Sequence, residues 1–92
     1  MKGNNNIMKT KNLNGYMNIV GSNIRKYRVL RGFSQRQLVN KLNLLGINIY
    51  NSDISRIENN TLFIRDYEQK AICKVLGITV EQLFEGTDKF FN

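Results

Sequence analysis

The sequence of 92 residues contains no histidine and no proline, and its only cysteine is Cys73. Without histidine, general acid–base chemistry would have to depend on scattered carboxylates, so we do not expect an enzyme. A single cysteine cannot form a disulfide within the chain, which fits a reducing compartment, and it cannot build a zinc site. We therefore expect a cytoplasmic protein that uses no metal and no cofactor.

Long hydrophobic runs are also missing. No stretch approaches the roughly 20 apolar residues that span a bilayer, and the N-terminus lacks the apolar block of a signal peptide. We therefore expect no membrane partner. A chain of this length suggests one domain with a thin core, which leaves no room for a separate ligand-sensing domain.

Acidic residues are scarce where the basic residues gather. The formal net charge is +7, and residues 21–60 hold seven basic residues against two acidic ones, whereas residues 61–92 hold four against five. A basic surface favours a polyanionic partner such as nucleic acid or an anionic membrane. A surface that only keeps the protein soluble explains the charge equally well.

The pattern of apolar residues divides the chain in two. Residues 1–18 are rich in asparagine, glycine and lysine and show no periodicity, which predicts a flexible arm that can be removed without unfolding the domain. Residues 19–92 form the predicted domain, in which helical spacing is interrupted at glycines. The pattern predicts a compact all-α domain with five helices, over residues 22–31, 35–45, 51–59, 66–76 and 79–85. The residues expected to point inward are Ile24, Tyr27, Leu38, Leu42, Leu45, Ile72, Cys73, Leu76, Leu83 and Phe84.

The clearest helix start lies at residues 33–38. Ser34 can cap the free amides of the helix while Gln37 reaches back, which makes a capping box, and Phe33 can pack on Leu38 across the cap. The next helix contains the stretch "NSDISRIENN", residues 51–60, in which Ile54 and Ile57 share one face and all other residues are polar. Two successive helices of this kind in a basic domain are typical of a helix-turn-helix.

Three segments extend this pattern: "IRKYRVLRGFSQRQLVNKL" (residues 24–42), "SDISRIENN" (52–60) and "AICKVLGITVEQLF" (71–84). Together they resemble the Cro/C1-type helix-turn-helix family of phage and bacterial repressors, also called the XRE family, over roughly residues 20–86. The step Arg-Gly-x-Ser-Gln at residues 31–35 and the run Ile-Ser-Arg-Ile-Glu-Asn at residues 54–59 are specific in combination. The resemblance implies a lambda-repressor-like fold whose helix over 51–59 lies in the major groove of double-stranded DNA.

The resemblance also implies roles for individual residues. Arginine can pair with guanine and asparagine with adenine, and Asp53 could only accept a hydrogen bond, for example from a cytosine amino group. The implied base-reading set is Asn51, Ser52 and Arg56, with Asp53 and Ser55 as further candidates, and the implied phosphate contacts are Arg36, Asn59, Asn60 and Gln35, unless Gln35 instead supports a reading side chain. Arg28 and Glu58 match a structural ion pair of the family.

Plainer roles compete with these. Asn51 or Ser52 could simply cap the helix, and Arg56 could be a solvated surface residue. Cys73 most simply packs in the core, and the sequence leaves Gln69 either at the surface or at a polar spot in the core. Tyr27, Tyr50 and Tyr67 are expected in the core or at its rim. The link "LGINIYN", residues 45–51, is about three residues longer than the family's usual turn, with Ile47 or Ile49 expected to tuck back.

Taken together, the sequence predicts a DNA-binding transcriptional regulator, most simply a repressor that acts as a homodimer. Two recognition helices about 34 Å apart would read a near-palindromic operator. Phe90 and Phe91 either belong to the dimer surface or fold back under the first helix. The alternative is an antitoxin or adaptor with the same fold, whose main partner is another protein.

Overall fold

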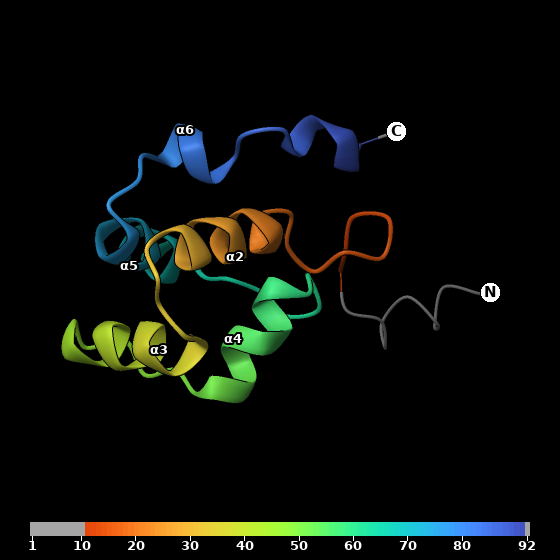
Figure 1. Cartoon of the computed structure of the whole chain (residues 1–92). Coiled ribbons are helices and arrows are strands. Elements are labelled where there is room, and N and C mark those ends of the chain that lie inside the picture. The colour runs from red at the N-terminus through yellow and green to blue at the C-terminus, as the bar shows by residue number, and fades with distance from the viewer. Residues whose placement is uncertain (1–10, 92) are drawn as a thin grey trace.

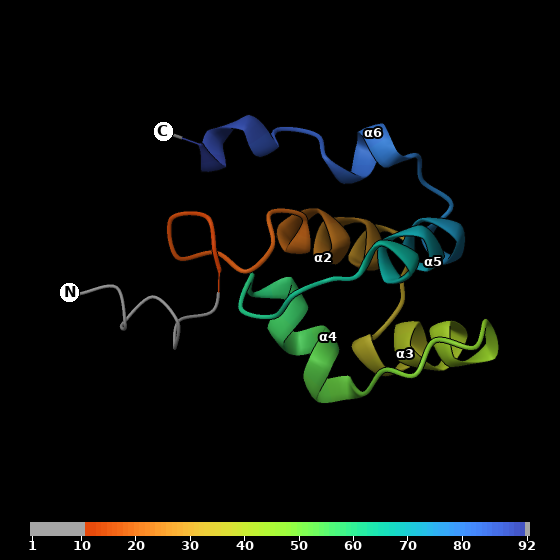
Figure 2. The ribbon, with the colours of Figure 1, turned by 180° about the vertical axis from the view of Figure 1, so that it is seen from behind.

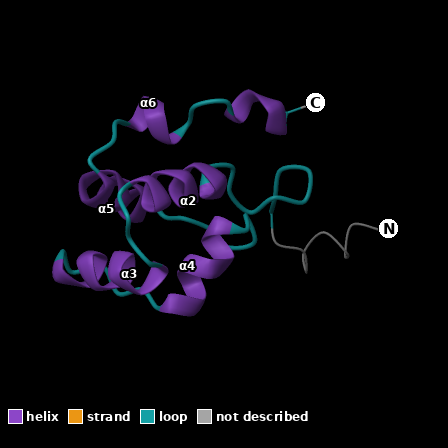
Figure 3. Cartoon of the chain, viewed as in Figure 1, coloured by secondary structure: helices purple, strands orange, loops and turns teal. Residues whose placement is uncertain are grey.

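The computed structural model describes residues 11–91. This part of the chain forms five α-helices, α2 (Gly21–Leu30), α3 (Gln35–Leu44), α4 (Asn51–Glu58), α5 (Asp66–Leu76) and α6 (Val80–Leu83), followed by the 3-10 helix η1 (Thr87–Phe90). Figure 3 shows only helices and loops here, and the one extended contact is an isolated bridge between Leu13 and Tyr16. The predicted all-α fold is confirmed, each predicted helix boundary lies within two residues of the observed one, and η1 was not foreseen.

Helix α2 lies in the middle of the molecule. In Figure 1, α3 and α4 lie below it, α6 and η1 lie above it, and the view from behind in Figure 2 keeps the same order. Helix α2 packs against α4, α5 and α6, while α3 packs against α4 and α5. No helix among residues 11–91 is long and apolar enough to cross a membrane.

One hydrophobic core joins all five α-helices and the links between them. Its buried members are Val20, Ile24, Tyr27, Leu38, Val39, Leu42, Ile49, Ile54, Ile57, Ala71, Ile72, Cys73, Leu76, Ile78 and Leu83. Two expected core residues are exposed instead, Leu45 and Phe84. Both lie at the ends of their helices, as C-cap residues, where the helical face no longer points at the core. Val39, which was not among the residues expected to point inward, is buried.

The start of α3 follows the predicted capping box. The Gln37 backbone N–H donates to Ser34 Oγ at 3.0 Å, and the Ser34 backbone N–H donates to Gln37 Oε1 at 2.8 Å. Phe33, next to the cap, is half-buried against the core, and Leu38 is fully buried. Two of the free amides at this end are therefore satisfied without water, which fixes where α3 begins.

Cys73 has the packing role expected of it. It is buried on α5, and its Sγ lies 4.0 Å from the Thr79 carbonyl oxygen. Burial raises the pKa of the Cys73 thiol, and the charge of Lys70 opposes this shift. The side chain therefore stays a neutral thiol near neutral pH, the weakly nucleophilic form.

The predicted flexible arm is too long. Residues 1–10 lie outside the described part of the chain, but residues 11–18 are bound to the domain, so the boundary at residue 18 is wrong. Asn18 Nδ2 donates to the carbonyl oxygens of Ile57 (3.0 Å) and Leu62 (2.9 Å), and Asn18 Oδ1 accepts from the Gly21 backbone N–H at 2.8 Å. Met17 also donates its backbone N–H to the Asn60 carbonyl. These bonds tie the residues before α2 to the end of α4.

Gly21 allows this junction to close. A Cβ built at Gly21 would lie 1.9 Å from the Ile57 carbonyl oxygen, 3.0 Å from the Ile57 carbonyl carbon and 3.2 Å from Asn18 Oδ1. The backbone at the start of α2 therefore touches the backbone at the end of α4, and only glycine leaves room for that approach.

We expect Gly21→Ala to lower the free energy of unfolding by at least about 2 kcal/mol, because backbone rather than a flexible side chain would have to move. Ser22→Ala is the matched control, since Ser22 is the next residue of α2 and is exposed, and it should change stability by less than about 0.5 kcal/mol. Urea unfolding followed by circular dichroism measures both variants. Equal stability of Gly21→Ala and wild type would show that α2 and α4 do not touch in solution.

Candidate nucleic-acid interface

Helix α4 has two distinct faces. Ile54 and Ile57 are fully buried between α2 and α3, and Glu58 is buried beside them. The opposite face carries the predicted DNA-binding side chains at helical spacing: Asn51, Ser52 and Arg56 are exposed, as is the C-cap residue Asn59, and Ser55 is partly exposed. Burial of the two isoleucines fixes which way this polar face points, because rotating the helix would expose both of them.

The buried carboxylate of Glu58 collects three hydrogen bonds from two other helices. Arg28 Nε donates to Oε2 at 2.6 Å and Arg28 Nη2 to Oε1 at 3.0 Å, so the predicted ion pair is present and bidentate. The side chains of Arg28 and Glu58 are only 11% and 3% exposed. Gln35 Nε2 adds a bond to Oε1 at 3.1 Å, and Arg28 Nη1 donates to the Phe33 carbonyl at 2.7 Å. This Glu58 cluster joins α2, the turn before α3, α3 and α4.

The start of α4 decides between two roles proposed for its first residues. Tyr50 is the N-cap, and its backbone N–H donates to Asp53 Oδ2 at 2.9 Å. Neither Asn51 nor Ser52 caps the helix, so their exposed side chains are available to a ligand. Asp53 is only partly exposed, and its carboxylate accepts the capping bond at the helix start. Capping therefore explains this carboxylate better than base reading does.

Asp53 also holds Arg56. Arg56 Nη2 donates to Asp53 Oδ1 at 3.0 Å, and the Arg56 side chain remains 55% exposed. An exposed pair one turn apart adds little stability, but it reduces the number of conformers that Arg56 samples before a ligand binds. Arg56 is therefore partly oriented along the outer face of α4 rather than freely solvated.

The long link between α3 and α4 is a defined structure. Asn43 Nδ2 donates to the Ile47 carbonyl at 2.8 Å and to the Ile49 carbonyl at 3.3 Å, and Ile49 is buried while Ile47 is only partly buried. Tyr50 at the end of the link is exposed, so the expectation of a core or rim position is wrong for it, and Tyr67 is exposed as well.

A groove of about 330 Å³ lies between α3 and this link. It is lined by Arg36, Val39, Asn40, Asn43, Asn48, Ile49, Tyr50 and Asn51. Arg36 is exposed beside it, as expected for a phosphate contact. Four amide side chains, one guanidinium and one phenol therefore line this groove at the start of α4, and none of the lining residues is acidic.

The end of α4 corrects one predicted contact. Asn60 is buried with a positive φ of 64°, its backbone N–H donates to the Ile57 carbonyl at 3.0 Å, and its Nδ2 donates to the Asn18 carbonyl at 3.0 Å. Its donors are thus used inside the protein, so Asn60 cannot serve as a phosphate contact. Asn59 is exposed and keeps its candidate role. Gln35 has neither predicted partner within the protein: its amide donates to Glu58, a residue of the structural ion pair, and not to a base-reading side chain.

A second groove, of about 670 Å³, runs between α2 and the end of α4. It is lined by Ser22, Arg25, Lys26, Val29, Glu58, Asn59 and Asn60. Arg25 and Lys26 are exposed there and extend the basic surface beyond the residues predicted from the sequence. Their basic character is visible in the sequence, but their position beside Asn59 depends on the packing of α2 on α4.

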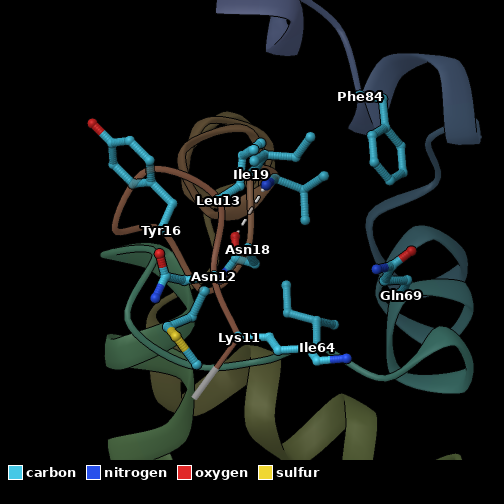
Figure 4. A pocket seen from close by; sticks show the side chains of 11 residues that line it. Lys11, Asn12, Leu13, Tyr16, Asn18, Ile19, Ile64, Gln69 and Phe84 are labelled. Carbon is cyan, nitrogen blue, oxygen red and sulfur yellow. Dashed lines mark hydrogen bonds between the residues drawn. The ribbon is translucent and has the colours of Figure 1, made fainter. Parts of the chain in front are cut away.

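A third hollow lies away from α4. It has a volume of about 370 Å³ and lies between residues 11–20 and the side chains of Ile64, Gln69 and Phe84. Figure 4 shows Gln69 and Phe84 on one side of it and Leu13 and Ile19 on the other. Gln69 is therefore at the wall of a surface hollow, partly exposed, and not at a polar spot within the core.

Comparison of the chain with family models, with curated proteins and with solved structures finds no match. Helix α4 and its surroundings therefore have to be interpreted from their own geometry. The described residues bring together a helix fixed by two buried isoleucines, an outward face of short polar side chains with one arginine, and basic residues on α2 and α3 that border that face.

We expect Arg28→Met to lower the free energy of unfolding by about 3 kcal/mol, because it leaves the buried Glu58 carboxylate without its charge partner. The double variant Arg28→Met/Glu58→Leu should recover most of that loss, since no charge then remains buried. Thermal unfolding of the two variants and wild type makes the comparison. Arg25→Met, an exposed arginine on the same helix, is the control and should be near neutral. Equal losses in the single and double variants would contradict the paired role.

Proposed function

We propose that the protein is a sequence-specific DNA-binding regulator of transcription, most simply a repressor, in which α4 enters the major groove. The observation that carries the proposal is the division of α4 into a buried apolar face and an outward polar face that follows directly after α3. This is the arrangement of a helix-turn-helix, whose second helix reads base edges while the preceding helix faces the backbone. The resemblance to Cro/C1-type repressors over residues 20–86 points the same way.

In this function, attraction to DNA and sequence specificity come from different residues. The formal net charge of +7 supplies the attraction to DNA, and phosphates are neutralised by exposed basic residues such as Arg36 and Arg25. Base edges are read by Asn51, Ser52 and Arg56, with Ser55 as a further candidate. Tyr50 lies close enough to Asn51 and Arg36, around one groove, to join the contact with the sugar-phosphate backbone.

Selection of bound sites from random double-stranded DNA tests the proposal directly. We expect enrichment of a near-palindromic sequence at moderate salt, because one short helix reads too few base pairs and two copies are needed. If no sequence is enriched even at low salt, the proposed function is wrong.

Dimerisation is proposed to use the C-terminal edge, made of Val80, Phe84 and Phe91. All three are exposed apolar residues on or after α6. Phe90 is not part of this edge, because its ring packs edge-on against Tyr16 at 4.8 Å and its carbonyl accepts from Asn14 Nδ2 at 3.0 Å. The sequence offered Phe90 and Phe91 the same two alternatives, a dimer surface or a position under the first helix. Phe90 instead contacts residues that precede α2, and the exposed Phe91 is the one that we assign to the dimer surface.

If the C-terminal edge forms the dimer contact, removing its aromatic rings should lower the mass measured by sedimentation. Phe84→Ser/Phe91→Ser should shift the protein from dimer toward monomer. Tyr67→Ser, which removes another exposed aromatic ring from α5, is the control and should leave the mass unchanged. A wild-type protein that is monomeric at all concentrations, or a double variant that stays dimeric, would contradict the assignment.

The roles of Arg56 and Arg36 are expected to differ in binding assays. Arg56→Ala should cost about 1–3 kcal/mol on the selected site and relax the preference at one position in each half-site, with little effect on random DNA. Arg36→Ala should weaken binding to every sequence alike and reduce the salt slope by about 1. Fluorescence anisotropy on selected and random duplexes at several salt concentrations measures both. Equal weakening of both duplexes by Arg56→Ala would make Arg56 a phosphate contact instead.

A further inference from the structure

A strongly exposed apolar surface lies at the other end of α3 from Gln35. Leu44, the last residue of α3, is 87% exposed, and the C-cap residue Leu45 is exposed beside it. These two leucines add little to the stability of the fold, because they stay in contact with water while Val39 and Leu42 of the same helix pack in the core. Neighbouring leucines left in water therefore suggest a function outside the domain.

These leucines border a shallow, open groove. Leu44 and Leu45 form one wall and Val75 of α5 forms the other, around a volume of about 330 Å³. The remaining lining residues are Lys41 and Lys74, so the groove has an apolar floor, positive charge on both helices and no acidic residue. We call these five residues the α3–α5 groove. Its apolar lining fits a protein segment better than DNA, whose phosphates require polar or charged donors.

The surroundings extend the positive charge. Lys41 Nζ lies 4.9 Å from the centroid of the Phe33 ring, so the cation is held at the edge of the groove. Arg31 Nε donates to the Leu76 carbonyl at 2.7 Å, so this basic side chain lies at the end of α5, outside the lining of the groove. A bound segment would therefore meet two cations, Lys41 and Lys74, beside the apolar residues.

We propose that the α3–α5 groove docks a segment of another protein that carries apolar anchor residues flanked by aspartate or glutamate. Charge complementarity selects acidic flanks, and the apolar side chains of Leu44, Leu45 and Val75 select apolar anchor residues. A second copy of this chain is a poorer occupant. If the acidic residues Glu81, Glu85 and Asp88 of one copy contacted the groove of the next, each copy would keep one free groove and one free acidic surface, which builds an open chain of copies. This docking surface is independent of the DNA contacts proposed for α4.

The test begins with a random 12-residue peptide library displayed on phage and selected against the full-length protein. We expect enriched peptides that contain at least two large apolar residues and flanking Asp or Glu. Synthetic fluorescein-labelled copies of the enriched peptides then give affinities by anisotropy. Leu44→Ser should weaken binding about tenfold or more through lost apolar burial, whereas Tyr67→Ser, an exposed aromatic outside the groove, should have no effect.

Charge reversal makes the test specific for the proposed chemistry. Lys41→Glu/Lys74→Glu should abolish binding of the acidic peptides, and a fresh selection against this variant should enrich peptides with Lys or Arg flanks instead. Thermal unfolding of Leu44→Ser and of the double variant should match wild type, because the altered side chains are exposed. Binding of Leu44→Ser to selected DNA should also be unchanged, because this substitution leaves the net charge as it is, and this result separates the proposal from the proposed function.

Four results would overturn the proposal. The first is a selection that enriches no acidic, apolar peptides, or enriches peptides insensitive to Leu44→Ser. The second is a smaller sedimentation mass for Leu44→Ser, which would make the groove a contact between copies. The third is binding to phosphatidylglycerol vesicles that Leu44→Ser removes, which would make it a membrane contact. The fourth is weaker DNA binding by Leu44→Ser, which would make the groove part of the DNA surface.

Discussion

The arrangement of α2, α3 and α4 depends on one buried carboxylate. Glu58 is placed at the end of α4 with its charge removed from water, so it requires the two donors of Arg28 and the amide of Gln35 in fixed positions. Because these donors come from different helices, satisfying Glu58 sets the relative placement of all three. A buried ion pair adds little net stability compared with apolar residues of similar volume, but leaving it half-formed is costly. The cluster therefore acts mainly by penalising other arrangements of the helices.

A second junction works through backbone rather than charge. Gly21 lets the start of α2 touch the end of α4, and Asn18 donates to two carbonyls there, Ile57 in the last turn of α4 and Leu62 just after the helix. Helix α4 is thus held at its C-terminal end by a charge cluster on one side and an amide cluster on the other. Its N-terminal end is set by Tyr50 and Asp53. A helix that reads bases needs this kind of support, since small displacements move every contact in the groove.

The sequence predicts most of what depends on local spacing. Ile54 and Ile57 identify the buried face of α4, and Ser34 with Gln37 marks the start of α3, because helical period and capping chemistry are properties of neighbouring residues. The roles of Asn18 and Asn60 were missed because their bond spans 42 residues and has no local signal. The position of Tyr50 was predicted wrongly for a related reason. The sequence shows the length of the link between α3 and α4 but not its path, which depends on the hydrogen bonds that Asn43 donates to it.

The rate at which a reagent labels the single buried thiol can report how often the domain opens. Cys73 is in the core, on a helix that contacts α2, α3 and α6, so a reagent reaches it only when that packing breaks. Its raised pKa also keeps it protonated until then. The rate of thiol labelling therefore follows the population of opened molecules. Any ligand that binds only the closed form lowers that population by mass action, so unlabelled DNA fragments or peptides can be ranked by how far they protect one native cysteine.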